Sequence, residues 1–178
     1  TGPGGDVDIP QSLDGKTVIS IGDYASYYND TITSVTIHEG VNSIGNWAFG
    51  GCDALTRVTI PEGVNSIGGY AFVNTALASV TIPEGLTSIG EDAFGGCDAL
   101  TKITVETGNL YYSSDEYGVL FNKDKTRLIQ YPAGSREGSY YIPGSVNSIE
   151  NYAFSNCAAL KSVTIPGSVN SIGDWAFS

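Results

Sequence analysis

The sequence predicts a mostly β solenoid, a fold in which short coils of chain stack on one another. A motif Ile-x-x-x-Ala-Phe recurs along the chain, with its isoleucines at Ile44, Ile67, Ile89, Ile149 and Ile172 and a degenerate copy from Ile21 to Ser26. The spacings are 23, 23, 22, 60 and 23 residues. Such a fixed period is typical of solenoids, because each unit buries its apolar face only by stacking on its neighbours.

The first expected element of each coil is a short strand. In the best copy, Val58-Thr59-Ile60 alternates apolar and polar residues, and Pro61-Glu62-Gly63 then turns the chain away. One strand per coil in a constant orientation builds a parallel sheet with rungs about 4.8 Å apart. The side chains expected to face inward in this copy are Leu55, Val58, Ile60, Val64, Ile67, Ala71 and Phe72.

The opposite wall of each coil is expected to come from Ser66-Ile67-Gly68, Ala71-Phe72 and their equivalents. Only about 23 residues are available per coil, so no long helix fits. We expect turns and short 3₁₀ segments on this wall, with further short strands as the alternative.

The spacing of 60 residues indicates that one repeat holds an insertion, at about residues 106–138. Within it, residues 118–121 and 127–131 flank the polar stretch 122–126, which predicts a β-hairpin with a five-residue loop. Four basic residues lie in or just after this hairpin, namely Lys123, Lys125, Arg127 and Arg136. We therefore expect a projecting hairpin that either carries a positive patch or is simply solvated.

The repeating unit Leu-x-x-Val-Thr-Ile-Pro-Glu-Gly-Val-x-Ser-Ile-Gly-x-x-Ala-Phe-x-x-Cys resembles the BspA-like class of bacterial leucine-rich repeats. "YGVLFNKDKTRLIQYP" is similar to that family's hairpin-bearing repeat, and "LDGKTVISIGDYAS" to its opening unit, although Ser26 stands where phenylalanine is usual. The resemblance implies a leucine-rich-repeat solenoid. It also implies a secreted or surface-displayed protein, since members with assigned roles are adhesins that bind host proteins or other bacteria.

Regular units over the whole length predict one elongated domain, residues 1–178, as part of a longer chain. The last coil stops at Phe177-Ser178, and a solenoid needs a polar cap, so we expect further chain or another molecule to cover this end. No run of 18 apolar residues is present to span a membrane. An extracellular or cell-surface location fits this composition.

The residues that could carry chemistry all have a structural interpretation, so we expect neither an enzyme nor a cofactor. Cys52, Cys97 and Cys157 each follow a repeat phenylalanine by three residues, which places any two at least two rungs, or about 10 Å, apart. They are predicted to be free thiols rather than disulfides or zinc ligands. His38 takes the turn position of a proline, and the serines at 43, 66, 148 and 171 are copies of one structural position.

One metal hypothesis stays open. Glu39, Glu62 and Glu84 occupy successive copies of one turn, and Ca²⁺ favours clustered oxygen ligands, but no calcium-loop signature accompanies them.

Two outward columns are candidates for recognition. The first precedes each repeat alanine and consists of Tyr24, Trp47, Tyr70, Asp92, Tyr152 and Trp175. Its rings either form an interface or only shield the edge of the next rung. The second is a ladder on the sheet that consists of Thr36, Thr59, Thr81, Thr104, Tyr141 and Thr164. It lies beside a column of mostly serine that is interrupted by Arg57 and Lys102. Threonine also suits strands for its own sake.

The sequence therefore predicts a binding or adhesion module for a protein or glycan on a host or bacterial surface. A net charge of −11 disfavours nucleic acid. The main alternative is a passive stalk that displays another domain, and the threonine ladder leaves an ice-binding face as a remote option.

Overall fold

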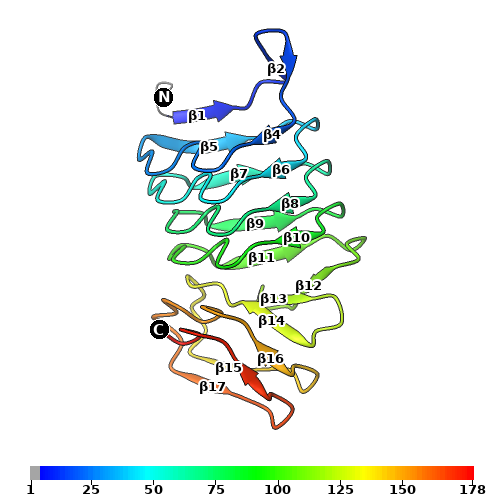
Figure 1. The fold of residues 1–178 in the computed structure, drawn as a ribbon. Helices are drawn as coiled ribbons and strands as arrows, with labels where there is room; N and C mark the ends of the chain where they lie inside the picture. The colour runs from blue at the N-terminus through cyan, green and yellow to red at the C-terminus, as the bar shows by residue number, and fades with distance from the viewer. Residues whose placement is uncertain (1–4) are drawn as a thin grey trace.

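A computed structural model of the chain describes residues 5–178, so the first four residues of the predicted domain lie outside the described part. The chain forms a stack of coils, and no helix occurs in the part described (Figure 1). The sheet face holds one strand per coil: β1 (Gly5–Asp8), β5 (Ile32–Thr36), β7 (Arg57–Thr59), β9 (Ser79–Ile82), β11 (Lys102–Val105), β15 (Ser139–Tyr141) and β17 (Ser162–Thr164). The predicted leucine-rich-repeat solenoid is confirmed.

Equivalent residues of successive coils pair in parallel and in register. Val35 lies opposite Val58, Val80 opposite Ile103, and Tyr140 opposite Val163. The sequence motif did not include β1, which adds a rung in front of the first full copy by pairing Val7 with Val35. Where neighbouring strands pair, the repeat period therefore decides which residues meet.

The opposite wall differs from the prediction of 3₁₀ segments. Between residues 5 and 178 it consists of turns and short strands with no 3₁₀ helix: β4 (Ser20–Ile21), β6 (Ser43–Ile44), β8 (Ser66–Ile67), β10 (Ser88–Ile89), β14 (Arg127–Gln130), β16 (Ser148–Ile149) and β18 (Ser171–Ile172). Adjacent wall strands such as β6 and β8 pair in parallel, and these hydrogen bonds hold the coils together. A 3₁₀ turn cannot do this, because its hydrogen bonds lie within its own segment.

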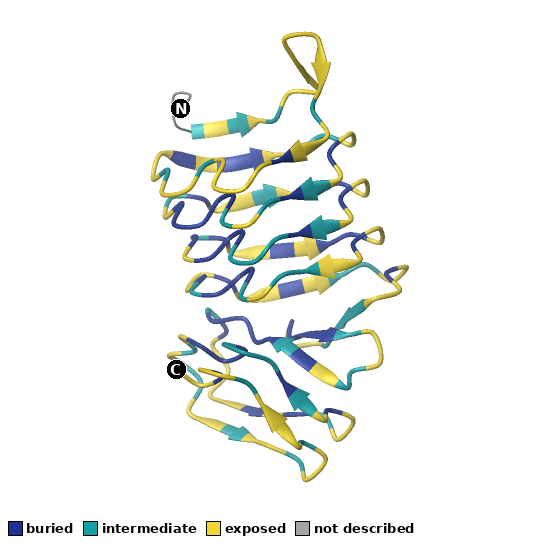
Figure 2. Ribbon diagram, viewed as in Figure 1, coloured by how far each residue is buried: buried dark blue, intermediate teal, exposed yellow. Residues whose placement is uncertain are grey.

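The core runs along the inside of the stack, as the burial colours in Figure 2 show. Phe49, Phe72 and Phe94 lie in a row, with ring centroids 5.4 and 5.7 Å apart and nearly parallel planes. Of the seven side chains expected to face inward in the best copy, five are buried, while Val58 and Ile60 are half-buried. The alignment of equivalent phenylalanines confirms that the coils stack directly on one another.

The inserted hairpin forms as predicted, but the expectation that it projects is wrong. β13 (Leu120–Asn122) pairs antiparallel with β14, and β12 (Tyr112–Ser114) adds a third antiparallel strand. β14 also pairs in parallel with β16, which puts Leu128 opposite Ile149, and Leu128 is fully buried. The hairpin takes over one level of the wall because its apolar side chains bury there instead of facing water.

Three of the four basic residues in or after the hairpin contact neighbouring groups. Arg127 pairs with Glu150 at 2.8 Å, the Lys123 ammonium donates to the Asn109 carbonyl, and Lys125 lies 5.6 Å from the centre of the Phe121 ring. Each of these three cations therefore has a local partner.

The insertion also interrupts the stack. The wall sheet β4-β6-β8-β10 ends at β10, and a separate sheet, β12-β13-β14-β16-β18, begins beyond it. The buried residues form two clusters, one from Ile21 to Leu120 and one from Val119 to Ala176. In Figure 1 the strands of the last coils run at an angle to those above. Tyr131 takes the place of a repeat phenylalanine at this level, with its ring 5.3 Å from that of Phe154.

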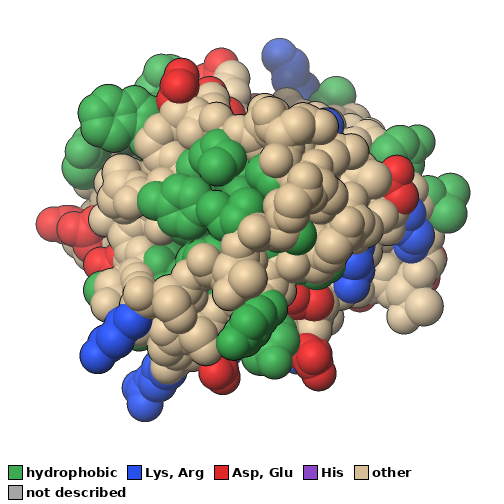
Figure 3. All heavy atoms as spheres, turned by 90° about the horizontal axis from the view of Figure 1, so that it is seen from below, with side chains coloured by type: hydrophobic (Ala, Val, Ile, Leu, Met, Phe, Trp, Pro, Cys, Tyr) green, Lys and Arg blue, Asp and Glu red, His purple; other side chains and the backbone are tan. Residues whose placement is uncertain are grey.

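The two ends of the stack differ in appearance. At one end, β2 (Ser12–Leu13) and β3 (Lys16–Thr17) form a small exposed hairpin. At the other, viewed from below in Figure 3, apolar side chains gather in a central hollow with charged side chains around the rim. Phe154, Leu160, Val163, Ile165 and Phe177 are among the residues that line this hollow.

Candidate functional site

The aromatic column occupies an unusual backbone position. All six of its residues have a left-handed φ: Tyr24 57°, Trp47 56°, Tyr70 58°, Asp92 49°, Tyr152 58° and Trp175 56°. In four of the six the N–H bonds a carbonyl of the next coil, as Trp47 does to Gly69 at 3.0 Å. For a residue with a Cβ it costs about 1–2 kcal/mol, which glycine avoids.

A second left-handed position in the same coils provides an internal comparison. It is held by Tyr28, Gly51, Asn74, Gly96 and Asn156, so four of its five copies carry glycine or asparagine, which tolerate this φ. The column position carries an aromatic ring in five of six copies and never glycine or asparagine. The backbone conformation therefore does not explain why aromatic residues occupy this position. Contacts of their side chains must offset the free-energy cost of the left-handed φ.

Three column residues pack together with two neighbours that the sequence did not single out. The Trp47 ring stacks on Tyr70 at 4.6 Å and lies parallel to Tyr24 at 6.5 Å. The Tyr27 ring meets both Tyr24 and Trp47 edge-on at 5.5 Å, and Tyr28 follows at 4.4 Å from Tyr27. We call this cluster of Tyr24, Tyr27, Tyr28, Trp47 and Tyr70 the aromatic face.

The aromatic face is partly open to solvent, with Trp47 and Tyr70 half-buried, and it rests on the backbone of the next coil. Tyr24 and Tyr28 are 57% and 66% exposed. A Cβ on Gly51 would come within 2.7 Å of the Tyr28 ring, and one on Gly50 within 3.0 Å of the Trp47 ring. Glycine at these two positions therefore lets the rings lie flat against the coil.

The remaining column residues lie apart from this face. Asp92 interrupts the series, and beyond it Tyr152 lies near enough to Tyr70 to help raise the pKa of Tyr70, with burial and Glu91 as larger causes. Trp175, at 67% exposure, makes no ring contact with the face within residues 5–178. Of the six predicted positions, three thus contribute to the aromatic face, two hold rings beyond it, and Asp92 has no ring.

The threonine ladder is exposed but divided. The structure pairs Thr36 with Thr59, Thr81 with Thr104, and Tyr141 with Thr164, in three separate sheets. The inserted coil comes between the second and third pairs, where the Ile103 N–H bonds the Gly118 carbonyl of the insertion at 3.1 Å. The ladder is therefore not the continuous flat array that an ice-binding face requires.

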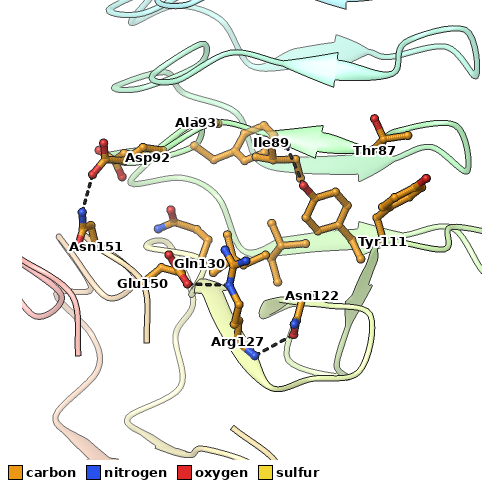
Figure 4. Close-up of a pocket in the computed structure, with 16 residues that line it drawn as sticks. Thr87, Ile89, Asp92, Ala93, Tyr111, Asn122, Arg127, Gln130, Glu150 and Asn151 are labelled. Carbon is orange, nitrogen blue, oxygen red and sulfur yellow. Dashed lines mark hydrogen bonds and ion pairs between the residues drawn. The ribbon is translucent and has the colours of Figure 1, made fainter. Parts of the chain in front are cut away.

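A cavity of about 450 Å³ opens beside Asp92, between β10 and the inserted coil (Figure 4). Its polar residues include Arg127 and Glu150, which form an ion pair, and Asn151, which donates to Glu91 across the gap at 2.7 Å. Burial, with a smaller contribution from Glu91, raises the pKa of Asp92 to about 7. The sequence did not predict this cavity.

The other candidates do not assemble into a reactive site. The described residues contain no group of three or more His, Cys, Asp or Glu side chains arranged to hold a metal. Glu106 joins the acidic turns: its pKa is raised, first by a hydrogen bond with Glu62 and then by burial. His38 caps its own turn, accepting from the Gly40 N–H at Nδ1. The cysteines are free, as predicted, and burial raises the pKa of all three thiols.

Comparisons with known proteins agree with this architecture. The model of the BspA type leucine rich repeat region matches in six copies over residues 19–130 and 135–178. Among solved structures, the pneumococcal vaccine antigen PcpA is 28% identical with a TM-score of 0.86, and the match covers 93% of this chain and 41% of that one. A leucine-rich repeat protein from Eubacterium ventriosum is also 28% identical, with a TM-score of 0.77 and coverage of 95% and 50%.

A leucine rich cell surface protein from Faecalibacterium prausnitzii is 27% identical, with a TM-score of 0.68 and coverage of 99% and 67%. This chain thus spans half or less of the first two matched structures. No protein with a curated description matches significantly. In the described residues no helix could cross a membrane. The repeat motif, the stacked coils and the match over most of the sequence together place the chain in the BspA-type leucine-rich repeat family.

Proposed function

We propose that this chain is a binding module outside a bacterial cell, and that its aromatic face holds a protein or glycan of a host or bacterial surface. The observation that carries the proposal is the left-handed backbone under Tyr24, Trp47 and Tyr70. Contacts between the rings offset the backbone cost of about 1–2 kcal/mol per residue. They also fix a flat, partly exposed aromatic surface, and this surface supports contact with a partner.

The chemistry of the face fits this role. Tyrosine and tryptophan dominate the energetics of protein interfaces, and their flat faces also stack on sugar rings. Trp47 is already packed between Tyr24 and Tyr70, so little side-chain entropy remains to be lost on docking. Tyr152 and Trp175 are secondary candidates for contacts at the rim of this face. The exposed threonines and Tyr141 lie on the sheet and form a separate candidate surface.

The surface setting is supported by the matched proteins. One is described as a cell surface protein and another as a vaccine antigen. Leucine-rich repeat proteins generally serve as scaffolds for binding, and the proposal assigns no catalytic step to this chain. The net charge of −11 argues against nucleic acid as the partner.

The test is a binding screen with variants that respect the backbone. The probes are immobilised extracellular-matrix proteins, a glycan array and whole bacterial cells. Trp47→Asn and Tyr70→Asn remove the rings, and asparagine already occupies left-handed positions at Asn74 and Asn156. The matched control is Tyr141→Asn, which removes a ring that is 73% exposed on the sheet face.

We expect at least one probe to bind the unmodified chain, and each face variant to weaken that binding about tenfold or more, as loss of an interface anchor does. The control variant should bind as the unmodified chain does, because Tyr141 lies on the sheet face, and a loss of binding there would move the site to the threonine ladder. If no probe binds, the passive stalk becomes the better interpretation. If a probe binds equally well to all variants, the partner uses another surface and this assignment is wrong.

A further inference from the structure

The cavity beside Asp92 is a product of the interrupted wall. Elsewhere each wall strand is paired with the next, but β10 is not paired with β14. The gap is crossed on this wall by the Ile89 N–H, which donates to the Tyr112 hydroxyl at 2.8 Å, and by the Asn151–Glu91 bond. The missing rung leaves a space of about 450 Å³, within the range of about 300–1,000 Å³ typical of small-molecule sites.

The interior of the cavity combines an apolar floor with polar sides. The floor includes Ile89, Ala93, Phe94, Leu120 and Ile129. In Figure 4, Arg127, Gln130, Glu150 and Asn122 lie on the side of the inserted coil, and Tyr111 lies at the edge. The Asn122 amide donates to Thr126 and accepts from the Arg127 N–H, and the Gln130 amide donates to the Tyr131 carbonyl. Each amide nitrogen and oxygen can make more than one hydrogen bond, so these two side chains can still meet hydroxyl groups in either sense.

The position of Tyr111 is set by a buried side chain. Asn109 has no exposed surface, and its Oδ1 accepts from the backbone N–H groups of Tyr111 and Tyr112 at 2.8 Å each. Its Nδ2 donates to the carbonyls of Pro83 and Leu86 in the preceding coil. Tyr111 itself is 51% exposed, so a ring on a fixed backbone stands at the mouth of the cavity.

The charges in the cavity are already occupied. Arg127 Nε bonds Glu150 Oε1 at 2.8 Å, which leaves little attraction for an anionic ligand. Glu91 is bonded to Asn151, and Asp92 holds a proton for part of the time near neutral pH because its pKa is raised to about 7. An anionic ligand is therefore disfavoured. The partner of Glu91 is a neutral amide, so a cationic ligand is the competing occupant, which the test below includes.

We propose that this cavity binds a neutral, hydroxyl-rich ligand, namely one or two pyranose rings of an uncharged saccharide. The sugar's C–H face lies against the apolar floor and the Tyr111 ring, and its hydroxyls bond Asn122, Gln130 and the Arg127–Glu150 pair. This site is separate from the aromatic face and does not depend on the function proposed for that face.

The first experiment measures binding of free sugars by ¹H–¹⁵N NMR. The probes are methyl glycosides of glucose, galactose, mannose and N-acetylglucosamine at up to about 10 mM, which suits millimolar affinities. N-acetylneuraminic acid and spermidine serve as anionic and cationic comparators. We expect saturable shifts at Ile89, Asn122 and Gln130 with at least one neutral glycoside and none with the charged probes.

Two variants test the location of the site. Tyr111→Ala removes the ring at the mouth, and Thr87→Trp fills the rim from an exposed position. Each should weaken binding about tenfold or more, whereas Tyr141→Ala and Thr59→Trp, which make the same changes on the sheet face, should leave it unchanged. Circular dichroism verifies that every variant is folded.

A glycan array then distinguishes a free saccharide from the end of a longer glycan. Signal for neutral glycans that Thr87→Trp abolishes identifies a terminal residue as the ligand. Saturable shifts without any array signal identify a free mono- or disaccharide. The proposal is overturned if no neutral glycoside gives saturable shifts, if a charged probe binds instead, or if the two cavity variants bind as tightly as their controls.

Discussion

Trp47 gives the sharpest test of the aromatic face, because its ring and its backbone can be separated. Trp47→Ala and Trp47→Gly both delete the indole ring, which stacks on Tyr70 at 4.6 Å. Only alanine keeps a Cβ at a φ of 56° and so keeps the left-handed strain. We therefore expect the glycine variant to be more stable than the alanine variant, the reverse of the usual order.

The magnitude follows from opposing contributions. Left-handed φ costs a residue with a Cβ about 1–2 kcal/mol, and the greater freedom of glycine in the unfolded chain offsets about 0.4–1 kcal/mol of that. The net advantage of Trp47→Gly over Trp47→Ala is thus about 0.5–1 kcal/mol. Both should lie about 2–4 kcal/mol below the unmodified chain, because Trp47 contacts three rings, each pair contributing about 0.5–1.5 kcal/mol.

The assay is urea unfolding followed by far-UV circular dichroism, since Trp47 is one of only two tryptophans and its loss would alter the fluorescence. For a chain of this length, 1 kcal/mol corresponds to about 2–4 °C in the melting temperature. The control is the same pair of substitutions at Thr59, an exposed position in β7, where glycine should be the less stable variant by about 0.5–1 kcal/mol. An equal or higher stability of Trp47→Ala would refute the role given to the backbone.

Two further predictions test the core and the cavity. Phe72→Ala should lower the free energy of unfolding by about 3–5 kcal/mol, because this ring has no exposed surface and lies between Phe49 and Phe94. Phe177→Ala should lower it by only about 1–2 kcal/mol, because that ring is 48% exposed. Equal losses of stability in urea unfolding would contradict the stacked core. For Asp92, the raised pKa means that the native chain keeps a proton between about pH 4 and pH 7 that the unfolded chain has lost, so stability falls as the pH rises through this window. Asp92→Asn should remove that fall and be more stable than the unmodified chain at about pH 8 in thermal melts, and an unchanged pH profile would mean that Asp92 is ionised normally.

The core and the columns could be predicted because they depend on contacts between neighbouring copies. Ile44 and Ile67 meet in register, and one period of 22 or 23 residues decides every such pair. The exposure of Tyr24 and Trp175 follows from the same pattern, since the inward positions of each coil are already filled. Tyr27 and Tyr28 were missed, although they stand where the next coil has Gly50 and Gly51, and that departure from the repeat was the available signal.

The amino-acid sequence by itself determined the repeat architecture, the free cysteines and the presence of a hairpin, because each of these follows from spacing or from local pattern. Only the tertiary structure decided that the hairpin lies within the wall, since this depends on Leu128 pairing with Ile149, a contact that no local pattern specifies. The cavity beside Asp92 has the same origin. It exists because the inserted strand β14 pairs with β16 of the next coil and leaves β10 of the preceding coil without a paired strand on that side, which depends on the packing of distant segments.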